Sequence, residues 1–214
     1  MDLMTLPGVF SPISDSWQLV DALRREDLGP GARVLDVCTG SGVLALAAAE
    51  QGAEATAIDV SRRAVLTVRL NARRNRLPVR ALRGRLFEPV ADERFDAIVS
   101  NPPYVPSADD ALPQRGPSRA WAAGRDGRKV LDQLCDEAPA HLRPGGRVLI
   151  IHSSLIDDGA TVARLERAGL TDVAVVERHR GPLGPLMREQ QAIGNIPADV
   201  EEEDVVIVRG VAPA

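Results

Sequence analysis

Short apolar segments alternate with helical patterns along most of this chain, and this alternation constrains its fold more than any other feature. Five segments rich in β-branched and apolar residues are bounded by Gly, Pro or Asp, as buried strands are. They span residues 32–37, 53–59, 77–82, 95–100 and 146–153. Between them, residues 42–52, 61–75 and 126–142 place apolar side chains at helical spacing. Repeated strand, helix and strand predict an α/β fold with a doubly wound, mostly parallel sheet and helices on both faces.

The order of elements changes after Ile151. The remaining pattern predicts a helix over residues 159–168, a strand over 171–178, a Gly- and Pro-rich surface loop over 181–197 and a last strand over 204–210. Internal repeats, low-complexity tracts and dividing linkers are absent from the sequence. We therefore expect residues 1–214 to form a single domain, with residues 1–30 as its N-terminal segment.

Composition excludes several classes of protein. The apolar runs stop far short of the roughly 20 residues that a membrane span requires. The N-terminus lacks the basic and apolar regions of a secretory signal. Cys38 and Cys135 lie far apart, outside any CxxC or Cys/His cluster, so neither a metal site nor a disulfide framework is indicated. These features predict a soluble, cytoplasmic protein without a bound metal.

Charge is unevenly distributed along the chain. The formal net charge of -4 argues against general electrostatic attachment to nucleic acid or to a membrane. Residues 60–87 nevertheless contain no acidic residue and many arginines. This stretch is either a solvated helix face with its following loop or a docking patch for an acidic or RNA-containing partner.

The segment VLDVCTGSGVLALAAA joins a predicted strand to a predicted helix through two glycines. Gly40 and Gly42 allow a sharp turn and let a ligand lie close to the backbone, while the free N–H groups of the helix start face a polar group. Asp36 lies at the end of the first strand, and Asp59 lies at the end of the second, where a carboxylate can accept both hydroxyls of a ribose. The pattern predicts a bound adenosine, but it does not choose between NAD and another adenosine cofactor.

The segment NPPY follows the predicted strand at residues 95–100. In a doubly wound sheet this strand neighbours the first one, so Asn101 to Tyr104 should face the crevice beside the glycine turn. The Asn101 side-chain oxygen and the Pro102 carbonyl can accept both N–H bonds of an NH₂ group, on which the Tyr104 ring can stack. Pro102 and Pro103 fix the backbone and remove competing donors. An amide or aromatic amine held in this way is a nucleophile, and its partner beside an adenosine would be the sulfonium methyl of S-adenosyl-L-methionine.

The order of VLDVCTGSG, AIDVS and NPPY resembles that of class I S-adenosylmethionine-dependent methyltransferases. The closest resemblance is to the release-factor glutamine methyltransferases, which modify the glutamine of a GGQ tripeptide. Further segments resemble that family over most of the chain: FSPISDSWQLVDAL, RGRLFEPV, WAAGRDGRKVLDQL and LRPGGRVLIIHSSL. The resemblance implies a Rossmann-like, seven-stranded sheet with an antiparallel last strand, protein N-methylation, and a peptide-chain release factor as a partner.

The resemblance also implies roles for individual residues. Ser16 and Asp36 would lie near the methionine end of the cofactor, Asp59 would bind its ribose, and Asn101 to Tyr104 would hold the substrate amide. The full expected cofactor set is Ser16, Asp36, Cys38, Gly40, Gly42, Asp59, Leu86 and Asn101.

The chain departs from the family pattern at three positions. Cys38 stands where a glycine is usual, Arg85 replaces an aspartate that contacts the adenine amine, and Ala123 replaces one of a glycine pair. Since an arginine has only donors, two outcomes are open: cofactor affinity is lower, or the backbone groups of Leu86 serve the adenine instead.

The predicted first strand begins at residue 32, which leaves no room before it for the helical substrate domain of the long bacterial enzymes. The chain resembles the short form of the family, whose members work with a small activating subunit. Three alternatives stay open. They are a methyltransferase of nucleic-acid adenine or cytosine amines, a small-molecule biosynthetic methyltransferase with residues 181–197 as a lid, and a non-catalytic adenosine-binding regulator.

Overall fold

Strand β1 (Arg33–Val37) lies inside the sheet, paired in parallel with β2 (Glu54–Asp59) on one side and with β4 (Phe95–Ser100) on the other. This structure is a computed structural model that describes residues 1–214. The remaining strands are β3 (Val79–Arg83), β5 (Leu142–Ser153), β6 (Thr171–Pro182) and β7 (Glu202–Val211). The seven strands follow the order β3-β2-β1-β4-β5-β7-β6, and β7 is antiparallel to both of its neighbours. The predicted fold class is confirmed.

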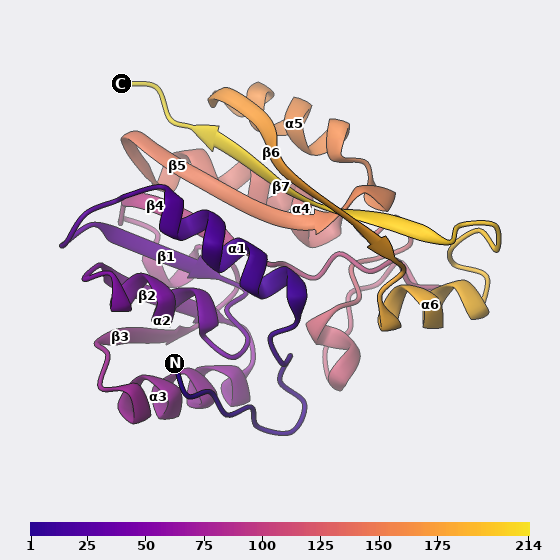
Figure 1. The fold of residues 1–214 in the computed structure, drawn as a ribbon, viewed down its shortest axis with the longest axis horizontal. Helices are drawn as coiled ribbons and strands as arrows, with labels where there is room; N and C mark the ends of the chain where they lie inside the picture. The colour runs from indigo at the N-terminus through magenta and orange to yellow at the C-terminus, as the bar shows by residue number, and fades with distance from the viewer.

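Helices cover both faces of the sheet, as Figure 1 shows. The helices are α1 (Ser14–Arg25), α2 (Val43–Glu50), α3 (Arg62–Asn75), α4 (Lys129–Glu137), α5 (Asp158–Arg167) and α6 (Pro185–Ala192). One core cluster joins α1, α2 and α3 to the sheet through residues such as Leu19, Leu44 and Val68. A second cluster joins α4 and α5 to the opposite face, with Leu134 and Leu165 among its members. No helix combines the length and the apolar character that crossing a membrane requires.

Several elements differ from the sequence prediction. The strand expected over residues 146–153 begins at Leu142, and the strand expected over residues 171–178 extends to Pro182. The helix expected over residues 126–142 ends at Glu137 and continues as a 3-10 turn, Ala138–His141. Pro139 explains this ending, because it has no N–H to donate to the helix. The loop expected over residues 181–197 contains α6, whose Met187 is buried together with Leu183. These side chains pack against a distant segment, and a local sequence pattern does not report such packing.

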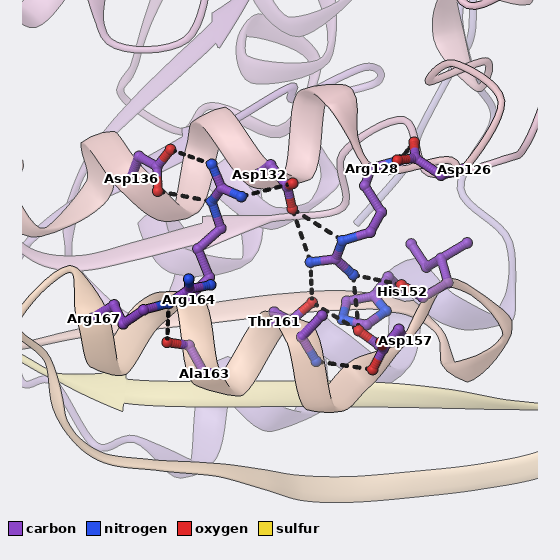
Figure 2. A network of polar contacts seen from close by, with 12 residues as sticks. Asp126, Arg128, Asp132, Asp136, His152, Asp157, Thr161, Ala163, Arg164 and Arg167 are labelled. Atoms are coloured by element: carbon purple, nitrogen blue, oxygen red, sulfur yellow. Dashed lines mark hydrogen bonds and ion pairs between the residues drawn. The ribbon is translucent and has the colours of Figure 1, made fainter.

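Two arginines tie α4 to α5 through a network of polar contacts (Figure 2). The Arg128 guanidinium donates to Asp132 Oδ1 at 3.0 Å, to Thr161 Oγ1 at 3.1 Å and to backbone carbonyls of the turn that precedes α5. Arg164 donates to Asp132 Oδ2 at 2.8 Å and to both oxygens of Asp136. Arg128 precedes α4 directly, so the network fixes the segment that follows NPPY against the second face of the sheet.

Candidate functional site

A cavity of about 1210 Å³ opens at the carboxyl ends of the parallel strands. Residues that follow β1, β2 and β4 line it, and the end of β6 and the start of β7 lie at the same edge. Ligands of doubly wound sheets bind at this edge. The expected glycine turn and the NPPY segment therefore contribute to one cavity.

The predicted residues do not all lie on the cavity wall. The wall contains Ser16, Cys38, Gly40, Asp59, Leu86, Asn101, Pro102, Pro103 and Tyr104. Asp36 and Gly42 are not among its lining residues. They lie behind the turn, so they can affect a ligand only through the shape of the cavity wall or through its electrostatic potential.

Positive φ angles produce the sharp turn after β1. Gly40 has φ of +54° and Gly42 has φ of +87°. A Cβ at Gly42 would lie 3.0 Å from a methyl carbon of Val68, so the absence of a side chain lets α2 pack closely on α3. Cys38 also adopts a positive φ of +60°, at the position where the resemblance implies a glycine. Burial, followed by the charges of Asp59 and Asp36, raises the pKa of the Cys38 thiol, which therefore stays protonated.

Asp59 connects the end of β2 to the glycine turn. Its Oδ2 accepts from the Gly40 N–H at 3.0 Å, and its Oδ1 accepts from the Ser61 N–H at 2.8 Å. Burial raises the pKa of Asp59, and the two N–H donors and the Arg119 charge oppose that shift. Each carboxylate oxygen keeps further lone-pair capacity toward the cavity, which suits the hydroxyl groups of a ribose.

Asp36 is completely buried beneath the turn. Its Oδ2 accepts from Thr39 Oγ1 at 2.5 Å and from the Ala45 N–H at 3.1 Å, but its Oδ1 has no partner. Burial raises the pKa of Asp36 to about 7, against the lowering effect of those two bonds. Through its charge, an unpaired carboxylate oxygen beneath the wall favours a positively charged group in the cavity, such as the methionine end of the expected cofactor.

The NPPY segment is held from two sides. Ser100 Oγ donates to the Val37 carbonyl at 2.7 Å, which ties the end of β4 to the end of β1. Asn101 Nδ2 donates to Ser16 Oγ of α1 at 3.4 Å, so two predicted residues from distant segments meet. This contact uses the amide nitrogen of Asn101, whose oxygen accepts no hydrogen bond from the chain and remains available to a ligand.

Tyr104 is fixed by a residue that the sequence did not single out. Its hydroxyl donates to Asp15 Oδ2 at 2.6 Å, and Asp15 is buried in the first turn of α1. Burial, the Asp15 charge and that hydrogen bond raise the pKa of Tyr104 well above its ordinary value. The phenol is therefore neutral, and its ring is held beside the elbow. The position of Asp15 next to Ser16 was the only signal for it in the sequence.

The segment after NPPY packs directly against the elbow. Val105 and Ala122 form an isolated parallel bridge, in which the Val105 N–H donates to the Trp121 carbonyl at 2.9 Å. Trp121 lines the cavity. Gly127 has φ of +71°, and a Cβ there would lie 2.3 Å from the Tyr104 carbonyl oxygen. Only a glycine permits this approach, so the GRDG segment acts as a support for NPPY.

Arg85 and Leu86 lie on the wall after β3. The Arg85 guanidinium donates to the Gln133 side-chain oxygen from α4, and the Arg85 N–H donates to Glu88 Oε2 at 3.2 Å. Leu86 is buried at a positive φ of +44°, and its N–H makes no hydrogen bond within the chain. A free backbone donor therefore stands where the resemblance implies an adenine.

Comparisons with known proteins agree with this geometry. A family model, the methyltransferase small domain, matches residues 1–114. The release factor glutamine methyltransferase of Geobacter sulfurreducens is 38% identical over 158 residues, which are 70% of this chain and 55% of that protein. A provisionally named protein N5-glutamine methyltransferase of Methanocaldococcus jannaschii is 32% identical over 186 residues, which are 85% of this chain and 90% of that protein. This chain thus spans about half the length of the first relative and most of the second.

A solved structure with the same fold is the Mtq2–Trm112 complex of E. cuniculi, responsible for the methylation of the translation termination factor eRF1. The match has a TM-score of 0.66 at 23% identity and covers 96% of this chain and 99% of that one.

Proposed function

This chain belongs to the S-adenosyl-L-methionine-dependent methyltransferases of the glutamine-modifying family, and we propose that it methylates the side-chain amide nitrogen of a glutamine in a protein. One observation carries the proposal. Asp59 and Asn101 line a single cavity, and the Asn101 amide is oriented by Ser16 so that its oxygen is free of partners in the chain.

Several residues would hold the cofactor. Asp59 would accept the ribose hydroxyls, the Leu86 N–H would serve the adenine, and Ser16 and Asp36 would act at the methionine end. Cys38, Gly40 and Gly42 shape the turn against which the cofactor lies. When bound, S-adenosyl-L-methionine supplies an electrophilic methyl group on a sulfonium.

The NPPY segment would orient the substrate amide. The Asn101 oxygen and the Pro102 carbonyl accept its two N–H bonds, and the Tyr104 ring, held by Asp15, lies on its plane. An amide nitrogen is a weak nucleophile, so orientation is the main contribution that the protein can make, and it can lower a barrier by up to roughly 7–11 kcal/mol. The amide nitrogen would lose one proton to water after it has accepted the methyl group, so the chain would not need to supply a strong base.

We propose a peptide-chain release factor with a GGQ tripeptide as the substrate, because the similar proteins include release factor glutamine methyltransferases. We further propose that a small activating subunit assists, as the fold neighbour Mtq2 is found in complex with Trm112. Residues 1–214 would act as one domain, with 1–30 as the N-terminal segment, in a reducing cytoplasm where Cys38 and Cys135 stay free.

The other functions are less well supported. Six arginines of residues 60–87 already donate hydrogen bonds within the chain, which leaves less of that stretch for nucleic acid; they are Arg63, Arg69, Arg74, Arg80, Arg83 and Arg85. The cavity of about 1210 Å³ exceeds the roughly 300–1,000 Å³ of a small-molecule pocket, as expected if a cofactor and a peptide segment share it. A non-catalytic regulator would bind an adenosine without transferring a group.

The decisive experiment incubates the purified chain with S-adenosyl-L-methionine and a release factor carrying GGQ, then measures peptide masses. We expect one added methyl group on the glutamine of the tripeptide. Parallel reactions contain a Trm112 homologue, to test the need for an activating subunit. Asn101→Ala is expected to lose turnover while cofactor affinity, measured by calorimetry, changes little. If the wild-type chain binds the cofactor but does not methylate the release factor, either alone or with the Trm112 homologue, the proposal is refuted.

A further inference from the structure

Glu203 places a buried carboxylate on the NPPY side of the cavity. It lies on β7, it is only 8% exposed, and it lines the cavity wall. Its Oε1 accepts from the Gly184 N–H at 2.7 Å, but its Oε2 has no partner. The proposed function gives this side chain no role.

The two buried carboxylates of this region have no ion-pair partner in the chain. Glu203 forms no ion pair, and neither does Asp15, whose two oxygens accept from Ser14 Oγ at 3.0 Å and from Tyr104 Oη at 2.6 Å. Asp15 and Glu203 are thus two buried carboxylates without an ion-pair partner, and the charges of both act on the Tyr104 phenol. Leaving a buried carboxylate unpaired is costly, so an occupant that brings a cation is favoured there.

The basic residues on this part of the wall make their hydrogen bonds with groups other than Glu203. Arg180 pairs with Glu202 on the outer side of the hairpin, and Arg188 Nε donates to the Leu183 carbonyl at 2.7 Å. His179 contacts Glu177. The Oε2 atom of Glu203, which is itself buried, therefore has no donor from the chain.

The surroundings of Glu203 suit a side chain with an apolar stem. Val105, Leu183 and Met187 are buried in one cluster, and Trp121 packs on it from the loop after NPPY. The side chains of lysine and arginine bury their methylene groups on such surfaces and place the charge at the end.

We propose that Glu203 determines specificity by binding a lysine or arginine that lies close to the target glutamine in the acceptor peptide. This inference rests on the proposed function, since it concerns the peptide that enters the same cavity. Glu203 takes no part in the chemistry. Its carboxylate binds the lysine or arginine cation of the peptide, while Asn101 and Tyr104 hold the glutamine amide.

Matched peptides test the proposal. Each synthetic GGQ peptide carries a lysine at one position that flanks the tripeptide. It is compared with a peptide that has norleucine at the same position, because norleucine keeps the apolar stem but lacks the charge. We measure kcat/KM by mass spectrometry and peptide affinity by fluorescence anisotropy, for the wild type, Glu203→Gln and Glu202→Gln. Glutamine at 203 keeps an acceptor for the Gly184 N–H, and Glu202 is the exposed neighbour on the same strand.

We expect the wild type to prefer lysine over norleucine roughly tenfold to a hundredfold at one or more positions, as one charge-assisted bond implies. Glu203→Gln should lose this preference, and Glu202→Gln should keep it. If norleucine peptides are methylated as well as lysine peptides at every position, or if Glu203→Gln retains the preference, the inference falls while the proposed function stands. If no peptide is methylated, both fall.

Discussion

Replacing Asp36 by asparagine removes a titrating carboxyl group from beneath the glycine turn while keeping its shape. The side chain is fully buried, and its two hydrogen bonds, from Thr39 and Ala45, go to one oxygen that asparagine can also provide. The variant should therefore change how the stability of the protein depends on pH more than it changes the structure.

The size of the effect follows from the pKa of Asp36, which burial raises from 3.8 to about 7. Well below its unfolded-state pKa of 3.8, the carboxyl group is neutral in the folded and the unfolded state alike. As the pH rises toward about 7, the unfolded chain loses this proton first, so folding stability falls. A shift of about 3 units corresponds to about 4 kcal/mol lost over this window, at 1.36 kcal/mol per unit. Asparagine has no proton to lose, so its variant avoids this loss.

Urea unfolding without cofactor, at pH values from about 4 to about 8, measures the difference in the free energy of unfolding between variant and wild type. We expect the free energy of unfolding of Asp36→Asn, relative to that of the wild type, to rise by about 4 kcal/mol from about pH 4 to about pH 8. The cost of an unpartnered amide NH₂ is independent of pH and cancels in this comparison. Asp92→Asn, at an exposed residue without a hydrogen bond in the chain, serves as the control.

A difference that stays constant with pH refutes the reasoning. It would mean that water or a rearranged turn solvates the Asp36 carboxylate in the folded chain. Calorimetry with S-adenosyl-L-methionine adds a second readout, in which Asp36→Asn should weaken binding because the free oxygen beneath the turn no longer carries a charge.

Two further substitutions probe the two halves of the cavity. Gly127→Ala would place a Cβ 2.3 Å from the Tyr104 carbonyl oxygen, so kcat should fall well below that of Gly145→Ala, which has the same φ of +71° but open space around it. Equal kcat values for the two variants, measured with saturating cofactor, would show that NPPY needs no support from this segment. Asp59→Asn replaces a carboxylate, whose Oδ2 accepts from the Gly40 N–H, with an amide that has a single acceptor oxygen. The affinity for the cofactor, measured by calorimetry, should therefore fall roughly tenfold to a hundredfold. Unchanged affinity would exclude the ribose role of Asp59.

The placement of the NPPY segment could be predicted because it depends on sheet topology rather than on side-chain detail. Strand periodicity locates β1 and β4, and their parallel pairing, Val34 with Ala97, brings the two strand ends to one edge. The turn at Gly40 and the carboxylate of Asp59 follow from the same logic, since each comes directly after a strand.

Other parts of the site could not be read from the sequence because they depend on packing between distant segments. Helix α6 forms in a Gly- and Pro-rich stretch, where burial of Met187 against Val105 outweighs the local pattern. Glu203 is one of three consecutive glutamates, and only the strand pairing decides which of them faces the cavity. The sequence likewise does not show that Asp36 lies behind the wall.

In the proposed assignment, the hairpin of β6 and β7 keeps the acceptor side of the cavity apart from its cofactor side. Residues 179–188 and Glu203 reach the cavity from the edge of the sheet formed by β7 and β6, where α6 lies in the connection between these two strands (Figure 1). Residues 38–61 reach the cavity from the centre of the sheet. Exchange of the hairpin tip between relatives could therefore redirect the enzyme to another protein while the machinery for the methyl donor stays intact. The choice of protein substrate can then change in evolution while the binding of the methyl donor does not.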